Sequence, residues 1–400
     1  MKNMMIELNP KEKFIINYLR FDPGKTTSEI VNALSLKRAN SYNILSKLHK
    51  QGFLVCRKTQ TTNGERGRNP ERWYINSTYA YVIGVEFWNW WIAVGLLDFS
   101  GNIVIYKNTR CPIGSLTGNQ DGLASKITDF IHDVIVESGL DREKILGIGF
   151  VAPGVVDLTT KEGIFYSHQK GLYRSALPRT VENFFGLPVI FQHNQITYAM
   201  AEYRFGGGRG ISNQLTILWR SEIGAAAVQK DQLFFSDPTR HLKFGHMIID
   251  FRGSPCRCGQ RGCLGNYVSE SFIISEISRL AESEGSILGG YSEINLDMVS
   301  EAIGKGDKLC IRVVFEAGNK VGVGVLNLMK LLDLELINVI GYTDDLAATL
   351  SAGIRETLDE MAPPNVQKPT IKHKGYDPFV GLRGAGETFL AQFFNNSPLK

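Results

Sequence analysis

The sequence predicts an α/β protein in two parts, a small basic N-terminal domain and a large body of two related α/β lobes. Its 400 residues are enough for two or three domains, and 43% of them are hydrophobic and 21% charged, as in ordinary globular proteins. Residues 1–76 contain 14 Lys and Arg against 6 Asp and Glu, a net charge of +8, whereas the remaining residues have a net charge of −4. From residue 80 onward, strand patterns alternate with helix patterns, and a meander of strands begins this order twice.

Composition argues against a secreted, disulfide-stapled or membrane-spanning protein. Six cysteines are too few for a disulfide framework in a chain of this length. Residues 1–14 contain no apolar run with a cleavage site. The most apolar stretch, residues 79–99, contains Glu86 and Asn89, so we interpret it as two buried strands joined by a turn. We therefore expect a cytoplasmic protein with reduced thiols and no membrane partner.

The basic domain begins with three short helix patterns. Residues 10–20 place apolar side chains at helical spacing, and a Pro-Gly pair ends that pattern. Residues 26–35 predict a second helix, with Thr26 or Thr27 as N-cap and Glu29 in capping-box range. Residues 35–52 predict a third helix, whose buried face would be Ala39, Tyr42, Leu45 and Leu48. Its opposite face offers six polar side chains: Lys37, Arg38, Asn40, Ser41, Asn43 and Lys47.

A β-hairpin follows the three helices. Residues 53–60 and 71–76 have strand patterns, and the Gly-rich segment between them carries Arg66 and Arg68 at its tip. Three short helices, the last one polar, followed by a hairpin wing are typical of a winged helix-turn-helix that places its last helix in the major groove of double-stranded DNA. The Lys and Arg side chains of the third helix would contact phosphates, and Asn40, Ser41 and Asn43 would read base edges. Arg66 and Arg68 would reach phosphates or the minor groove. The alternative is a helical hairpin that makes protein contacts.

The body reads as two lobes with a cleft between them. "YVIGVEF", "WIAVGLLD" and "GNIVIYKN" predict a three-stranded meander, and an amphipathic helix and the buried strand "ILGIGFVA" follow. A strand over 187–195, a helix and a second strand pair over 213–234 come next, before the late buried strand "ELINVIG". Ligands usually bind in the cleft of such folds.

Several motifs resemble those of the ROK family. That family contains sugar kinases of the actin-like ATPase (ribonuclease H-like) fold and repressors, among them xylose- and N-acetylglucosamine-type repressors, that carry a winged helix before the same body. The matching segments are "GRNPERWYIN", "GIGFVAPGVVD", "YAMAEYRFGGGRG", "FGHMIID", "PCRCGQRGCLGNYVS" and "GLRGAGETFLA". The resemblance covers nearly the whole chain. It implies a winged helix-turn-helix over 1–76 and a ROK body over 77–400. The body's first lobe would be 77–190 with the C-terminal helix 381–396, and its second lobe 191–380.

The cysteine-rich segment is the most specific of these motifs. The resemblance implies the ligand set His246, Cys256, Cys258 and Cys263, spaced H-x9-C-x-C-x4-C. Three thiolates and one imidazole make a closed tetrahedral site for structural Zn²⁺. Three clustered cysteines also leave one unpaired, which counts against a simple disulfide. The isolated cysteines are expected to be core residues: Cys56, Cys111 and Cys310.

The resemblance also implies that the kinase chemistry is lost and that no ATP binds. Asn194 stands where the kinases carry the aspartate base, and an amide cannot accept the proton. Trp88 and Trp90 replace the small residues of the first phosphate loop. Arg220–Glu222 replaces the second phosphate loop, and a carboxylate there would repel phosphate. We therefore expect no catalytic residues.

Most sugar-holding positions of the family are altered too. They correspond to His193, Asn194, Lys243, His246 and Gly265, of which only His246 is unchanged. Two hypotheses follow. Either the cleft binds another effector, such as an acidic sugar or a sugar phosphate suited to Lys243 and His193, or it is empty.

Together these observations predict a DNA-binding transcriptional regulator, a repressor of carbohydrate metabolism, with a catalytically inactive effector and dimerisation body. We expect a homodimer or tetramer, because palindromic half-sites need two-fold symmetry. The alternatives are an active sugar kinase with a DNA-binding appendage and a regulator controlled by a protein partner.

Overall fold

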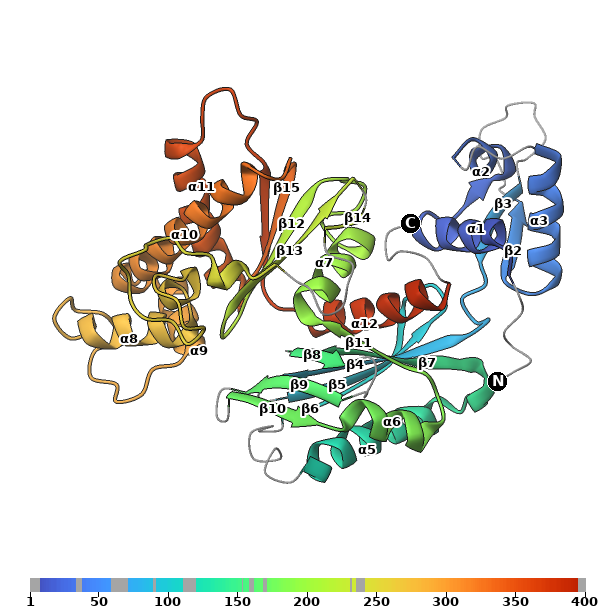
Figure 1. Ribbon diagram of the computed structural model, residues 1–400, viewed down its shortest axis with the longest axis horizontal. Helices are drawn as coiled ribbons and strands as arrows, with labels where there is room; N and C mark the ends of the chain where they lie inside the picture. The colour runs from blue at the N-terminus through green and yellow to red at the C-terminus, as the bar shows by residue number, and fades with distance from the viewer. Residues whose placement is uncertain are drawn as a thin grey trace. The chain divides into compact units, whose positions relative to one another are not determined.

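The computed structural model describes residues 8–33, 38–58, 71–88, 91–110, 120–152, 154–157, 162–167, 171–230, 232–234 and 242–394. The side chains of 38–40, 120–121, 155–157, 165–167 and 171–173 are not described. The chain divides into two compact units (Figure 1). Unit 1 comprises residues 1–192 with the C-terminal helix from Leu382, and unit 2 comprises His193–Gly381.

The N-terminal part of unit 1 contains the three predicted helices and both strands of the predicted hairpin. They are α1 (Pro10–Phe21), α2 (Thr27–Ala33), α3 (Arg38–Lys50), β2 (Leu54–Lys58) and β3 (Glu71–Ile75), and a short strand β1 (Lys25–Thr26) completes the antiparallel sheet β1-β3-β2. The predicted capping box before α2 is confirmed. The Thr26 hydroxyl accepts a hydrogen bond from the Glu29 amide, and the Glu29 carboxylate accepts one from the Thr26 amide.

The predicted orientation of α3 was wrong at two neighbouring positions. Ser41 is buried at 0% exposure, whereas Tyr42 is 59% exposed. The reason is helix geometry. Leu45 and Leu48, both buried, stand four and seven residues after position 41, so Ser41 lies on the same face and Tyr42 lies about 100° around the helix. The size and apolar character of tyrosine favoured the wrong assignment.

The first lobe of unit 1 is a five-stranded sheet with helices on both faces. The sheet order is β11-β7-β4-β5-β6, formed by β4 (Tyr81–Trp88), β5 (Trp91–Asp98), β6 (Ile103–Arg110), β7 (Ile145–Ala152) and β11 (Val189–His193). Helices α5 (Gln120–Ser138) and α6 (Leu177–Phe185) cover one face, where they pack against Ile83, Val85 and Phe87 (Figure 1). The shorter elements are η1 (Arg142–Lys144) and the sheet β10-β9-β8, made of Gly171–Ser175, Glu162–Ser167 and Gly154–Asp157.

The C-terminal helix α12 (Pro378–Phe393) covers the opposite face of this sheet (Figure 1). The alternating strand residues on that face are glycines where the helix approaches. A Cβ atom on Gly149 would lie 2.1 Å from the carbonyl oxygen of Ala385. The small residues in "GIGF" are therefore needed for close packing of α12 on the sheet.

One hydrophobic cluster joins the winged helix to the first lobe. It contains residues of the N-terminal helices, the first strand of the lobe and α12, among them Ile15, Leu45, Val82, Phe389 and Phe394. The residues on the two sides of the predicted boundary near residue 76 thus pack in one continuous core.

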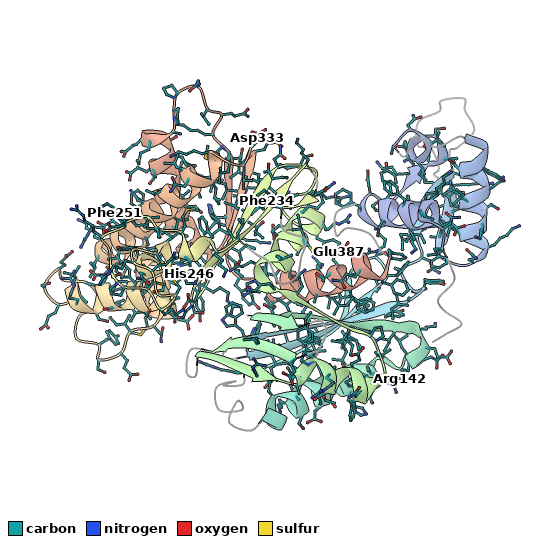
Figure 2. All side chains as sticks on the ribbon, viewed as in Figure 1. Arg142, Phe234, His246, Phe251, Asp333 and Glu387 are labelled. Atoms are coloured by element: carbon teal, nitrogen blue, oxygen red, sulfur yellow. The ribbon has the colours of Figure 1, made fainter. Side chains whose placement is uncertain are left out.

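A buried ion pair crosses the same junction. The Arg20 guanidinium lies 2.6 Å from the Glu387 carboxylate, and the two side chains are 4% and 3% exposed. Arg20 also donates to the backbone oxygen of Phe99, at 2.9 Å. Figure 2 shows Glu387 on α12. The position of the winged helix on the lobe is therefore fixed by charge as well as by apolar contacts.

Unit 2 repeats the strand order of the first lobe. Its sheet is β14-β13-β12-β15-β16, formed by Gln232–Leu233, Ile223–Gln229, Gln214–Trp219, Leu336–Ile340 and Thr370–Lys374. In both sheets an antiparallel meander comes first, and the next strand pairs in parallel with the meander's first strand: β7 with β4, and β15 with β12. The prediction of two related lobes is confirmed by this topology.

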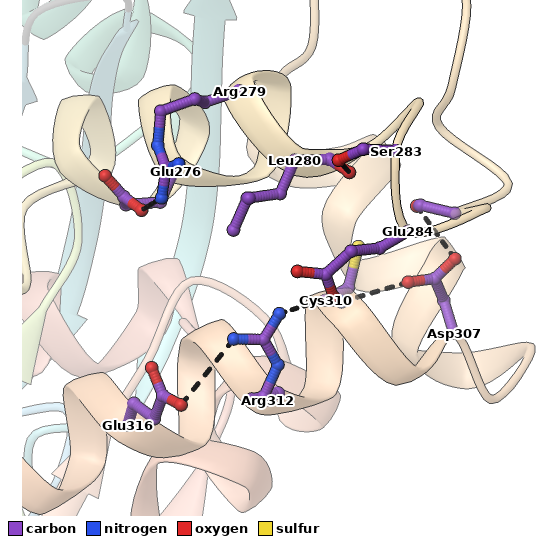
Figure 3. A network of polar contacts seen from close by, with 10 residues as sticks. Glu276, Arg279, Leu280, Ser283, Glu284, Asp307, Cys310, Arg312 and Glu316 are labelled. Carbon is purple, nitrogen blue, oxygen red and sulfur yellow. Dashed lines mark hydrogen bonds and ion pairs between the residues drawn. The ribbon is translucent and has the colours of Figure 1, made fainter.

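Four helices of unit 2 bury one large cluster against its sheet. They are α8 (Glu270–Leu280), α9 (Leu296–Gly304), α10 (Lys308–Met329) and α11 (Asp344–Met361), with η2 (Phe244–His246) and η3 (Leu264–Tyr267) in the loops. Helix α7 (Asn194–Phe205) packs against β12 and β13 outside this cluster. Asp307 caps α10 and also accepts hydrogen bonds from Ser286 and the Ile287 amide (Figure 3). The loop after α8 is thereby fixed to the start of α10. No helix in the described ranges is long and apolar enough to cross a membrane.

Candidate metal centre and nucleic-acid interface

Unit 2 brings the four predicted metal ligands together. His246 is the last residue of η2 (Figure 2), and the cysteines lie on the loop that follows. The donor atoms of His246, Cys256, Cys258 and Cys263 all lie within 4.8 Å of one another. The Cys258 and Cys263 sulfurs are 3.6 Å apart, and the Cys256 sulfur is 3.6 Å from Nδ1 of His246. Tetrahedral Zn–S bonds of about 2.3 Å place two sulfurs roughly 3.8 Å apart, so this donor set could hold a metal ion of that size.

The backbone of the loop explains the glycines in the motif. Two isolated β-bridges, Ile248 with Cys263 and Pro255 with Arg261, fold the segment back on itself. Gly262 has φ +67°, and a Cβ atom there would lie 1.4 Å from the carbonyl oxygen of Asp250. Only glycine fits this turn, which directs Cys263 toward the other ligands.

The electrostatics of the cluster favour a bound cation. Burial of the Cys263 side chain and its neighbouring thiols raise the pKa of that thiol to about 12. Without a positive charge beside it, Cys263 stays protonated at neutral pH, and a divalent cation supplies that charge. Burial lowers the pKa of His246, and the Arg257 guanidinium lowers it further. A neutral imidazole retains the lone pair that a metal needs.

The metal loop is tied to the turn between β12 and β13. Arg257, between the first two cysteines, lies 2.9 Å from the Glu222 carboxylate. Arg220, at the other end of the same turn, lies with its guanidinium carbon 3.8 Å from the centre of the Tyr376 ring. Both charged residues of the segment 220–222 thus contact other side chains of unit 2.

The effector residues suggested by the sequence lie in two segments that pack against the start of β13. His193 and Asn194 begin α7, and their side chains accept hydrogen bonds from the Gln195 amide. A Cβ atom on Gly224 would meet the Gln195 side chain, and one on Gly245 would meet the Ile223 carbonyl oxygen. Asn194 is buried and Lys243 is exposed. Of the four residues, His246 also belongs to the metal cluster.

The predicted DNA-contacting residues are only partly described. Lys37, Arg66 and Arg68 lie outside the described residues, and of Arg38 and Asn40 only the backbone is described. Asn43 is exposed on α3, whereas Ser41 is buried and cannot reach a base edge. The Lys47 ammonium lies 2.5 Å from the buried Glu12 carboxylate of α1, so Lys47 ties α3 to α1.

The sequence prediction missed two candidate contact residues. One is Tyr42, for the reason given above. The other is Arg57, which is exposed on β2 and lies over the Tyr74 ring at 5.1 Å. Strict alternation along "FLVCRK" would have placed Arg57 on the outer face of the hairpin.

Comparison with known proteins identifies relatives over most of the chain. The model of the ROK family matches residues 82–391. The chain is 25% identical to the xylose repressor of Caldicellulosiruptor bescii over 84% of both chains. It is 24% identical to the DNA-binding transcriptional repressor Mlc of Escherichia coli, over 75% of this chain and 73% of Mlc. A glucokinase of Halalkalibacterium halodurans is 26% identical over 74% of this chain and 88% of its own.

Solved structures show the same fold. The crystal structure of a ROK family transcriptional regulator, described as a homologue of the E. coli MLC protein, superposes with a TM-score of 0.79 over 98% of both chains at 19% identity. A ROK family glucokinase from Streptomyces griseus superposes with a TM-score of 0.64, covering 77% of this chain and 99% of the kinase, at 24% identity. The regulator therefore matches the N-terminal part as well as the body, whereas the kinase structure covers 77% of this chain.

Proposed function

The chain belongs to the ROK family, and we propose that it is a sequence-specific DNA-binding transcriptional regulator, a repressor of carbohydrate metabolism. The observation that carries this proposal is the winged helix-turn-helix, three helices and an antiparallel hairpin packed before the ROK body. The regulator structure named above covers 98% of this chain, whereas the glucokinase structure covers 77% of it. The exposed side chains of α3 and the hairpin would contact the operator.

The test is DNA binding by the full chain and its point variants. Deletion of the winged helix is not suitable, because this domain shares its core with α12 and its removal would expose that core. We expect mobility-shift assays with genomic fragments to give a binding constant whose logarithm falls linearly with the logarithm of the salt concentration. Lys50→Glu with Lys58→Glu, both exposed in the winged helix, should reduce that slope by about 2. Lys320→Glu, exposed on α10, is the matched control and should bind as the unchanged protein does. Equal binding by all three proteins would contradict the proposal.

We further propose that the Cys3His cluster holds one structural Zn²⁺. Four protein ligands would fill a tetrahedral site and leave no open position, so the metal would stabilise the loop and supply no chemistry of its own. Through Arg257 and Glu222 it would also fix the turn between β12 and β13.

The same body is proposed to lack kinase activity. Asn194 has a buried amide that accepts a hydrogen bond from Gln195, and an amide is no general base. Glu222 places a carboxylate in the segment that corresponds to the second phosphate loop, paired with Arg257. The result expected with Mg-ATP and a panel of sugars is no ADP release above the protein-free rate. Turnover that Asn194→Ala abolished would instead identify an active kinase.

We propose that the altered sugar-holding positions, among them Lys243, bind an anionic effector. Lys243 is exposed at one of the altered positions, and Arg257 nearby pairs with Glu222. In the same samples, without ATP, acidic sugars or sugar phosphates should raise the melting temperature, and neutral sugars should not. If none of them stabilises the protein at millimolar concentration, control by a protein partner is favoured.

A further inference from the structure

The first half of α3 presents a small set of side chains to solvent. Among its described side chains, Ser41 and Leu45 face the core, and Tyr42 and Asn43 are exposed. Within the part of the chain that the structure describes, neither Tyr42 nor Asn43 makes a side-chain hydrogen bond. A helix in the major groove contacts base edges with the residues near its N-terminal end, which is where these two lie.

The rest of the winged helix holds α3 rigidly behind this pair. Leu45 and Leu48 are fully buried in the cluster shared with α1 and the first lobe. Lys47, one turn beyond Asn43, is bound to the buried carboxylate of Glu12. Lys47 therefore acts as a positioning residue. The polar side chains that remain for base contact lie nearer the start of the helix.

The exposure of Tyr42 has significance only because of its position on α3. A single exposed aromatic residue is common and carries no message by itself. Here the aromatic ring stands beside an amide on the helix that the proposed function places in the groove. The two side chains supply different contacts: a flat apolar surface suited to the C5-methyl of thymine, and a carboxamide suited to the N6 and N7 edge of adenine.

We propose that Tyr42 is a specificity-determining residue whose ring contacts a thymine methyl group, and that Asn43 beside it binds adenine through a bidentate pair. This inference rests on the proposed function, and it adds that each half-site contains A·T pairs read by these two residues. Asn43 accepts from the adenine N6 amino group with Oδ1 and donates to N7 with Nδ2.

The experiment is selection of bound sequences from random double-stranded DNA by the full chain and its variants at one salt concentration. Tyr42→Ala should lose about tenfold preference for thymine at one position of each half-site, and Asn43→Ala the same for adenine at a nearby position. Tyr42→Phe should retain the thymine preference. Phe14→Ala, which removes an exposed aromatic side chain from α1, is the matched control and should select the original motif. The half-site spacing also measures the expected two-fold symmetry.

A chemical change in the DNA gives a second test. Deoxyuridine in place of the contacted thymidine removes only the methyl group. It should weaken binding by the unchanged protein severalfold and leave the affinity of Tyr42→Ala unaltered, with equal salt slopes throughout.

The outcomes separate the two proposals. If the unchanged protein enriches no motif, the proposed function fails. If it enriches a motif that Tyr42→Ala still selects with the same preferences, the regulator stands and the role of Tyr42 is overturned. Uniform weakening with a smaller salt slope would make Tyr42 a residue of the phosphate contacts and would also overturn the inference.

Discussion

Replacing Glu387 by alanine should lower the free energy of unfolding of unit 1 by about 3–5 kcal/mol, because it leaves the charge of Arg20 buried without an opposite charge beside it. Both side chains are nearly inaccessible to solvent. The Arg20 guanidinium donates to the Glu387 carboxylate and to the Phe99 carbonyl oxygen. Solvent cannot replace the lost carboxylate without opening the junction between α1 and α12. The winged helix should then be held by apolar contacts and by the hydrogen bond from Arg20 to the Phe99 carbonyl oxygen.

Urea denaturation gives the size of the effect, and hydrogen exchange of peptides from residues 8–33 and 382–394 shows where it occurs. The double replacement Arg20→Met with Glu387→Leu should recover most of the stability, since a well-packed apolar pair often replaces a buried ion pair without loss. Arg279→Ala breaks the exposed ion pair with Glu276 (Figure 3) and is the matched control, with an expected cost below about 1 kcal/mol. A cost for Glu387→Ala no larger than that of this control would refute the role of the pair.

This ion pair also marks the limit of what the sequence could predict. Helices and strands followed from local periodicity. The metal-ligand set followed from the resemblance to a family motif that spans eighteen residues, which a single loop can satisfy. Arg20 and Glu387 are separated by 367 positions, and neither lies in a pattern that distinguishes a buried charge from an exposed one. The shared core was hidden for the same reason, because Ile15 and Phe389 belong to one cluster although they lie near opposite ends of the chain.

The orientation of α3 failed for a more local reason. Position 41 holds a small polar residue on the buried face, and position 42 holds a large aromatic residue on the exposed face. A rule that places apolar residues inside and polar residues outside assigns both positions to the wrong face. The spacing from Leu45 and Leu48 nevertheless indicates that position 41 is on the buried face. Departures of this kind are expected where a residue serves binding rather than packing.

Replacing Cys263 by serine should reduce the zinc content far below one ion per chain and destabilise unit 2 by several kcal/mol. Cys263 is the buried member of the ligand set, and its sulfur lies 3.6 Å from that of Cys258. Because the unfolded chain holds no preformed site, the free energy of metal binding is also free energy of folding. A chelator should therefore lower the melting temperature of the unchanged protein and have little effect on the variant.

Cys310→Ala is the matched control for this replacement. Cys310 is also a buried thiol of unit 2, and burial raises its pKa to about 12, but it lies on α10 outside the cluster. Removing it should cost packing energy and leave one zinc ion per chain, as measured by elemental analysis of untagged protein. The destabilisation by Cys263→Ser should vanish when both proteins are compared in excess chelator, whereas that of Cys310→Ala should persist. Only the destabilisation by Cys263→Ser is expected to depend on the metal. A purified protein without zinc would therefore show that packing alone holds the four ligands together. The same conclusion would follow if both variants responded to chelator in the same way.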